Sequence, residues 1–187
     1  LMTSTKIGEY IELCKHMGIQ VLPPDINASR DSFTVDKNSI RFGMAAVKSV
    51  GENALKTIVK IRETDGPFKS LEDFCSRVSS RCINKRSLEN LIKCGAFDSL
   101  GYNRAQYLAI LDQAMDLGMR HQKDLASGQM DLFGDFSEEE NFIDKIDVPK
   151  IDEFPKMELL NMEKEITGFY ITGHPLEEYR EKIEHLY

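Results

Sequence analysis

Residues 40–62 read IRFGMAAVKSVGENALKTIVKIR, and this pattern predicts a short helix, a tight turn and a second helix. The turn is expected at residues 48–51, and the second helix is expected to begin at Glu52. Four side chains with apolar groups then recur at helical spacing: Leu55, Ile58, Val59 and Arg62, the last through its stem. Such a turn leaves the first N–H groups of the second helix without partners, and the helix dipole makes them a site for an anion.

Basic side chains flank the predicted anion site. Lys48 lies at the start of the turn and Lys56 on the second helix, so the phosphate of a nucleic acid is the expected ligand. We interpret the stretch as a helix-hairpin-helix that binds the DNA backbone without reading the base sequence. The alternative is a hairpin that binds nothing and carries Gly51 only to relieve a left-handed turn. DNA-binding hairpins usually have another turn glycine where this chain has Ser49, and commonly an alanine where it has Leu55.

The composition of the 187-residue chain is that of a soluble, largely globular protein, with 41% hydrophobic and 29% charged residues. No apolar run approaches the roughly 20 residues that cross a bilayer, and no signal peptide is evident. The cysteines form no CxxC pair and the histidines do not fall at zinc-ligand spacing, so neither a metal nor another cofactor is expected. Unpaired cysteines favour a reducing, cytoplasmic location. Because the chain starts at Leu1 and stops inside an apparent helix at Tyr187, we expect a piece of a longer protein.

The net charge of −7 hides two parts of opposite sign. Residues 1–127 carry 18 Lys and Arg against 15 Asp and Glu, whereas residues 128–187 carry 6 against 16. Residues 40–105, which contain the predicted hairpin, carry 12 against 7. We therefore expect the middle of the chain to attract DNA and the C-terminal part to repel it.

The rest of the pattern predicts a mainly α fold: a helical domain with tandem helix-hairpin-helix-like units and one small β-hairpin. A first helix is expected over residues 7–17, and two short strands, over residues 32–35 and 39–42, are expected on either side of residues 36–38. Ser70 and Asn84 are expected to cap two further helices. The helix from Asn84 and another from Asn103 form a second helix-turn-helix, with four basic residues nearby: Lys85, Arg86, Lys93 and Arg104. Its turn lacks the glycine pattern, so packing against the first unit is its expected role.

The region from residue 127 to residue 155 is acidic, rich in turn residues and poorly periodic, so we expect an exposed linker. One apolar island interrupts it: Gln129, Met130, Asp131, Leu132 and Phe133. Because chains seldom leave adjacent large apolar groups in water without use, this island either folds back on the domain or docks on a partner. In the docking interpretation Leu132 and Phe133 fill a pocket and Gln129 fixes the register. The pentapeptide is similar to the one by which bacterial replication proteins bind the sliding clamp.

Several blocks of sequence follow one another in a specific order: LPPDIN, IRFGMAAVKSVG, GPFKSLEDFC, NKRSLENLIKCGAFDSLG, QMDLF and EKEITGFYITGHPLEEY. This ordered set resembles the catalytic alpha subunits of bacterial DNA polymerase III, the C-family replicative polymerases, and it covers nearly the whole chain. The resemblance implies that residues 1–42 are the C-terminal part of the fingers region and residues 43–126 a helix-hairpin-helix DNA-binding region. Residues 127–155 would then be an acidic linker with the clamp-binding peptide, and residues 156–187 a helical segment leading to the next domain.

The resemblance also implies roles for particular residues. It assigns contact with the backbone of the template–primer duplex to Lys48, Ser49, Val50, Gly51 and Asn53, to which the charge pattern adds Lys56. It assigns binding of the sliding clamp to residues 129–133, with Met130 as a filler. The implied partners are double-stranded DNA, the sliding clamp and other polymerase III holoenzyme subunits.

The same resemblance implies that the parent protein is a DNA-directed DNA polymerase, a nucleotidyltransferase that uses a divalent metal, Mg²⁺. Phosphoryl transfer with two metals requires Asp or Glu side chains held on a firm framework. The chain shows no such constellation of carboxylates, so it is expected to be inactive alone.

Two other functions fit part of the pattern. A helix-hairpin-helix module of a DNA repair nuclease, or of another DNA-handling protein, would share the DNA contact but not the LPPDIN and TGHP blocks. A protein-interaction scaffold would have no affinity for DNA. Charge reversal at Lys48 and Lys56 separates the scaffold from the other two functions, and alanine at Leu132 and Phe133 separates the polymerase segment from the nuclease module.

Overall fold

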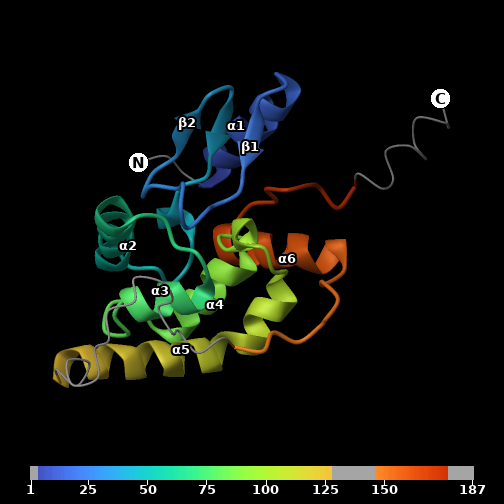
Figure 1. Ribbon diagram of the computed structural model, residues 1–187. Helices are drawn as coiled ribbons and strands as arrows, with labels where there is room; N and C mark the ends of the chain where they lie inside the picture. The colour runs from blue at the N-terminus through green and yellow to red at the C-terminus, as the bar shows by residue number, and fades with distance from the viewer. Residues whose placement is uncertain (1–3, 128–145, 177–187) are drawn as a thin grey trace.

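The computed structural model describes residues 4–127 and 146–176, and within these ranges the protein is mostly helical, as the sequence predicts. Figure 1 shows α1 (Ser4–His16) and a small sheet above the other helices, with the long helix α5 (Arg104–Ser127) at the opposite end. Among the described residues, no helix is both long enough and apolar enough to cross a membrane.

The small sheet has three strands, one more than the predicted hairpin. Strands β2 (Thr34–Asp36) and β3 (Ser39–Arg41) form the expected antiparallel pair. Strand β1 (Gln20–Leu22) adds to the other edge of β3 in parallel, with Val21 opposite Ile40. A small cluster of buried side chains joins the sheet to α1 and to the C-terminal segment: Ile11, Val21, Phe42 and Ile171. The parallel pairing depends on residues distant in the chain, so no local pattern predicts it.

The first helix of the predicted hairpin is a single 3₁₀ turn, η1 (Met44–Ala46). Ile40 and Arg41 lie in the strand that the sequence predicts over residues 39–42, and they pair with strands on both sides of β3. Gly43 has an extended backbone conformation, and the loop that contains Asp31 packs directly against it. A Cβ at Gly43 would lie only 2.5 Å from the carbonyl oxygen of Asp31. The predicted helix between this strand and the turn is therefore reduced to a single 3₁₀ turn of three residues.

The remaining helices begin close to the predicted residues. Helix α2 (Glu52–Asp65) starts at the residue that the sequence indicates. Ser70 and Asn84 cap α3 (Leu71–Arg77) and α4 (Lys85–Lys93), and each side chain accepts a hydrogen bond from an amide in the first helical turn. Further along the described chain come η2 (Asp98–Leu100), α5 and α6 (Lys156–Thr167).

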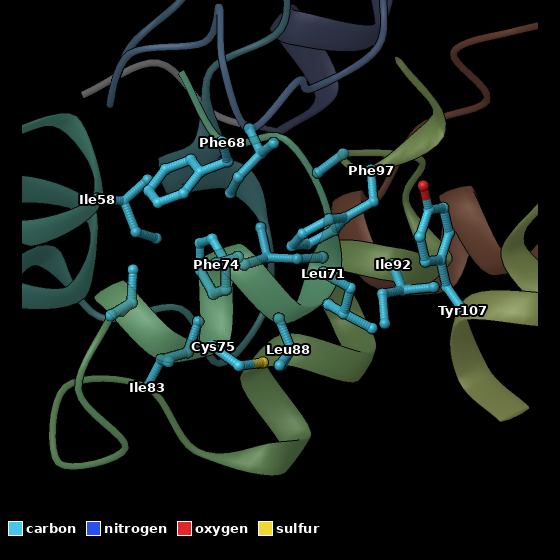
Figure 2. Packing of buried hydrophobic residues seen from close by; sticks show 14 of the residues in the cluster. Ile58, Phe68, Leu71, Phe74, Cys75, Ile83, Leu88, Ile92, Phe97 and Tyr107 are labelled. Atoms are coloured by element: carbon cyan, nitrogen blue, oxygen red, sulfur yellow. The ribbon is translucent and has the colours of Figure 1, made fainter. Parts of the chain in front are cut away.

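The main core lies between α2, α3, α4 and α5, as Figure 2 shows. Aromatic rings run through it in a row, with centroids 4.9, 5.3 and 5.9 Å apart: Phe68, Phe74, Phe97 and Tyr107. Aliphatic side chains surround the rings, among them Ile58, Leu71, Leu88 and Ile92. Burial raises the pKa of two core thiols, Cys75 and Cys94, to about 12, so both stay protonated and unreactive. This core fixes the helices that surround the turn at residues 48–51.

Helix α3 lies directly against α5. Gly118 of α5 faces the backbone of α3, where a Cβ would approach the Cβ of Cys75 to 2.8 Å. Gln122, one turn further along α5, donates from its amide to the carbonyl oxygens of Cys75 and Val78 at 3.0 and 3.1 Å. These bonds satisfy carbonyl groups that the end of α3 leaves without helical partners.

The described part of the predicted linker, residues 146–155, is docked on the helices rather than exposed along its length. Ile146 and Val148 are half-buried and pack against the main core. Glu153 accepts hydrogen bonds from the amides of Arg104 and Ala105 at 2.8 and 3.2 Å. The carboxylate thus caps the N-terminus of α5, where the free amides and the helix dipole favour a negative charge.

A buried charged network joins α6 to the connection between α4 and α5. Arg104 donates to Asp98 at 2.9 Å and to Glu163 at 3.2 Å, and Glu163 is completely buried. The other carboxylate oxygen of Glu163 accepts from the amides of Ile171 and Thr172 at 3.1 and 3.0 Å. Burial by itself would lower the pKa of Arg104, but the hydrogen bond and charge of Asp98, aided by Glu163, raise it, so the guanidinium stays charged.

Candidate nucleic-acid interface

The predicted turn lies at the surface between η1 and α2. Ser49 is exposed and has φ of +67°, in the left-handed region. DNA-binding hairpins usually carry a glycine at this position. Ser49 therefore adopts the left-handed backbone conformation that glycine would adopt more easily. Gly51 is extended and forms the N-cap of α2. The chain therefore makes a left-handed turn before α2 although the first glycine is absent.

Replacing Ser49 by glycine is expected to stabilise the protein by about 0.5 kcal/mol. The left-handed conformation costs an L-residue roughly 1–2 kcal/mol, whereas the extra chain entropy of glycine costs about 0.5–1 kcal/mol. The midpoint of urea unfolding measures the difference. Ser80→Gly is the matched control, because Ser80 is an exposed loop residue outside the left-handed region and should lose stability. A lower midpoint for Ser49→Gly than for the parent chain would contradict the expectation.

Neighbouring helices hold the turn through its backbone. The Lys48 amide donates to the Ile166 carbonyl oxygen of α6 at 3.1 Å. The Lys48 carbonyl oxygen accepts from Nδ2 of Asn90 on α4 at 2.8 Å. The Ser49 carbonyl oxygen accepts from the hydroxyl of Ser87, also on α4. Three backbone groups in the first half of the turn are therefore tied to α4 and α6.

The start of α2 presents backbone N–H groups at the surface. Gly51, Glu52 and Asn53 are exposed, and Gly51 has no side chain that could cap the helix. The first four amides of an α-helix have no intrahelical partner. Together with the dipole of this 14-residue helix, these amides can bind an anion such as a phosphate.

The two predicted lysines have different surroundings. Lys48 is exposed beside the turn. Lys56 forms an ion pair with Glu52 at 2.6 Å, and the hydrogen bond to Glu52 raises the pKa of Lys56. Both side chains are more than two-thirds exposed, at 71% and 77%, so water and salt screen the pair and it can open when a phosphate approaches. Until then Glu52 opposes an anion at the start of α2, and Lys56 offsets that charge.

A groove of about 480 Å³ beside α2 has a balanced charge. Its lining includes three basic and three acidic side chains: Arg30, Lys56, Lys60, Asp31, Glu52 and Glu63. Arg30 and Glu63 already form an ion pair across it at 3.2 Å. The groove does not select anions, so the turn and the first amides of α2 are the better candidate site.

The second predicted helix-turn-helix packs against the first. Arg104 is buried in the charged network, and Lys85 pairs with Asp112 of α5 at 2.6 Å. Arg86 is exposed and Lys93 half-buried. The face of α4 that contacts the turn carries two uncharged side chains, Ser87 and Asn90, which form hydrogen bonds to the turn. The second unit therefore packs against the first, which is the role that the sequence favours for it.

The predicted DNA-binding residues lie together at the turn and at the beginning of α2. Val50 is half-buried against the main core, and five are exposed: Lys48, Ser49, Gly51, Asn53 and Lys56. The predicted clamp-binding residues lie outside the described residues: Gln129, Met130, Asp131, Leu132 and Phe133. Within residues 4–127 and 146–176, no group of three or more His, Cys, Asp or Glu side chains could hold a metal ion.

Ser87 and Asn90 are site residues that sequence reasoning missed. They lie 38 and 42 residues from their partners in the turn, so no local spacing connects them. A weaker signal exists in the pattern of α4, because both polar residues sit beside Leu88 and Leu91 on the side that packs inward. Buried polar side chains require hydrogen-bond partners, and here the partners are the turn carbonyl groups.

Comparisons with known proteins also identify a helix-hairpin-helix in the region that contains the turn and α2. The family model described as a helix-hairpin-helix motif matches residues 18–107. DNA polymerase III subunit alpha of Vibrio cholerae is 38% identical over 179 residues, or 95% of this chain. The proteins of the same name from Escherichia coli (strain K12) and Bacillus subtilis (strain 168) are 38% and 41% identical over 96% and 95% of this chain. The chain spans about 15% of the length of each of these relatives.

The turn, α2 and the matched region define a chain that carries a helix-hairpin-helix motif. The identity extends well beyond that motif, over almost the whole chain. The chain is a homologue of one segment of DNA polymerase III subunit alpha.

Proposed function

We propose that this chain binds the phosphate backbone of duplex DNA, without sequence preference, as part of a replicative DNA polymerase III alpha subunit. The amides of Ser49, Gly51, Glu52 and Asn53 would contact phosphate, and Lys48 and Lys56 would add positive charge; the Val50 amide already donates to the Val47 carbonyl oxygen at 3.3 Å. The observation that carries this proposal is the uncapped start of α2, next to a left-handed turn that α4 and α6 hold in place. Contacts limited to the backbone position a protein on DNA and carry no sequence information.

The apolar island at residues 129–133 supports a second contact, with the sliding clamp. In this proposal Leu132 and Phe133 fill a pocket on the clamp, and Gln129 fixes the register by hydrogen bonds. Tethering of this kind raises the effective concentration of polymerase at the primer end without any new contact to the bases. The longer protein would meet the other holoenzyme subunits through its remaining segments.

The proposed role of this chain is to bind and orient the duplex, not to transfer nucleotides. Template-directed polymerisation would belong to the longer protein of which the relatives are examples. That protein would hold its divalent metal, Mg²⁺, on carboxylates in other segments, where the metal would stabilise the charge of the transferred phosphate. We therefore expect the isolated chain to bind DNA and to be inactive as a polymerase.

Reversing both lysine charges tests DNA binding. The variant Lys48→Glu/Lys56→Glu is expected to bind a fluorescein-labelled duplex of mixed sequence about tenfold or more weakly, because each lysine at a phosphate releases counterions from the DNA. The slope of log affinity against log salt should fall in magnitude by about two, roughly one for each lost phosphate contact. Fluorescence anisotropy over a range of salt concentrations measures both quantities.

A matched control reverses two positive charges at another place on the surface. Arg120 and Lys123 are exposed on α5, outside the turn and α2. The variant Arg120→Glu/Lys123→Glu has the same net charge as the test variant and is expected to bind DNA nearly as the parent chain does. Equal retention of DNA by the parent chain and by Lys48→Glu/Lys56→Glu would exclude the proposed site.

A further inference from the structure

We infer that Ser87 and Asn90 are positioning residues for DNA binding: they set the direction of the turn's peptide groups without touching DNA themselves. The inference rests on the proposed function of the turn. Both side chains are buried, with 3% and 7% of their surfaces exposed. They therefore act on DNA only through the backbone that they hold.

The two bonds fix two consecutive peptide groups. Asn90 holds the Lys48 carbonyl oxygen, and Ser87 holds the Ser49 carbonyl oxygen, both from the direction of α4. In a planar trans peptide the carbonyl and the next N–H point in opposite directions. Because the Lys48 oxygen points toward α4, the N–H of Ser49 points away from it, toward the exposed side of the turn. Asn90 thereby orients an amide donor for a phosphate.

The left-handed conformation of Ser49 makes this support necessary. At φ of +67° an L-residue is strained, and rotating the peptide group between Lys48 and Ser49 would return φ to the favoured negative range. That rotation would turn the N–H inward and the Lys48 oxygen outward, where it would repel a phosphate. The bond from Asn90 is lost in the rotated state, and the bond from Ser87 holds the next peptide group in place, so together they favour the orientation that binds an anion.

The hydroxyl of Ser87 has a second neighbour, Asn84 Oδ1, at 3.1 Å. The Ser49 oxygen is the closer of the two acceptors. Asn84 already accepts from the Ser87 amide at 2.9 Å as the cap of α4. The hydroxyl proton is thus available to the turn, while the capping bond places Ser87 in the first turn of α4.

The test measures duplex binding by variants that remove the two anchors and leave every exposed residue of the turn unchanged. Asn90→Leu keeps the size of the side chain and removes its donor, and Ser87→Ala removes only the hydroxyl. The double variant is expected to bind the labelled duplex about tenfold more weakly than the parent chain. Its salt slope should fall in magnitude by about one, because one phosphate contact is lost. A stability loss alone, in a chain that circular dichroism shows to be folded, would leave that slope unchanged.

Two further variants make the test specific. Ser49→Gly in the Ser87→Ala/Asn90→Leu background should restore most of the affinity, because glycine adopts the left-handed conformation without support. Gln122→Leu removes an amide that bonds to the carbonyl oxygens of α3, and it should bind DNA as the parent chain does. If the double variant does not fold, Ser87→Ala alone carries the comparison, with Ser87→Thr as the variant that keeps the hydroxyl.

The outcomes separate this inference from the proposed function. Parent-like affinity and salt slope in a folded double variant would overturn the positioning role and leave DNA binding by the turn intact. Weakened binding that Ser49→Gly does not restore would also overturn it, because the loss would then not arise from the peptide orientation. A parent chain without affinity for duplex DNA would overturn both.

Discussion

Replacing Glu163 by alanine is expected to lower the free energy of unfolding by about 3–5 kcal/mol, because it removes one partner of a buried ion pair. Arg104 would keep Asp98, but it would lose the partner on its buried side. The amides of Ile171 and Thr172 would also lose their acceptor, and a buried donor without a partner costs about 1–3 kcal/mol. Urea unfolding followed by circular dichroism measures the loss.

Two variants serve as controls for the Glu163 result. Glu165→Ala removes an exposed carboxylate from the same helix and should change the stability by less than about 0.5 kcal/mol. Glu163→Gln keeps the shape and one acceptor, so its loss should lie between those of the two alanine variants. A loss below about 1 kcal/mol for Glu163→Ala would show that the network stabilises little.

The charged network also bears on the candidate DNA site. Ile166, whose carbonyl oxygen accepts from the Lys48 amide, follows Glu163 by three residues on α6. Figure 1 shows α6 beside α4, the other helix that holds the turn. Arg104 bonds to Glu163 on α6 and also donates to the Lys93 carbonyl oxygen at the end of α4 at 2.9 Å, so it links the two helices that support the turn. A polar network inside the protein thus contributes to the geometry of its surface.

Several elements could be predicted from sequence because their causes are local. The start of α2 follows from the turn residues and the apolar spacing after Glu52. Ser70 and Asn84 cap helices because each side chain reaches an amide three residues ahead. Gly18 follows α1 with φ of +72°, as expected for a residue that ends a helix.

The features that sequence reasoning missed depend on partners distant in the chain. The parallel partner of β3 was missed, because β1 comes from an earlier part of the chain. Arg104 has the charge of a DNA-binding residue, but its partner Glu163, 59 residues away, holds it in the interior. Glu153 is one of many acidic residues in a predicted linker, and its role as a cap appears only when α5 lies beside it. For Arg104 and Glu153 the sequence predicts the charge, and packing decides whether that charge meets solvent or a partner.

Replacing Leu132 and Phe133 by alanine is expected to weaken binding to a bacterial sliding clamp by about 2 kcal/mol or more, or about 30-fold. The reason is that two adjacent large side chains supply most of the apolar surface that such a short peptide can bury. Isothermal titration of the purified clamp with the parent chain and with the double variant measures the difference. Gln129→Ala should cost less, because it removes hydrogen bonds that exchange with water.

A matched control truncates two apolar side chains outside the peptide. Leu125 and Ile151 are exposed, and Leu125→Ala/Ile151→Ala should leave clamp affinity unchanged. Undiminished clamp binding by the Leu132→Ala/Phe133→Ala variant would show that residues 129–133 are not the docking site, and no binding by the parent chain would exclude the tether. Salt separates the two proposed contacts: DNA affinity should fall steeply as salt rises, because counterions are released. Clamp affinity from apolar burial should change little, since added salt screens charges and not apolar contacts.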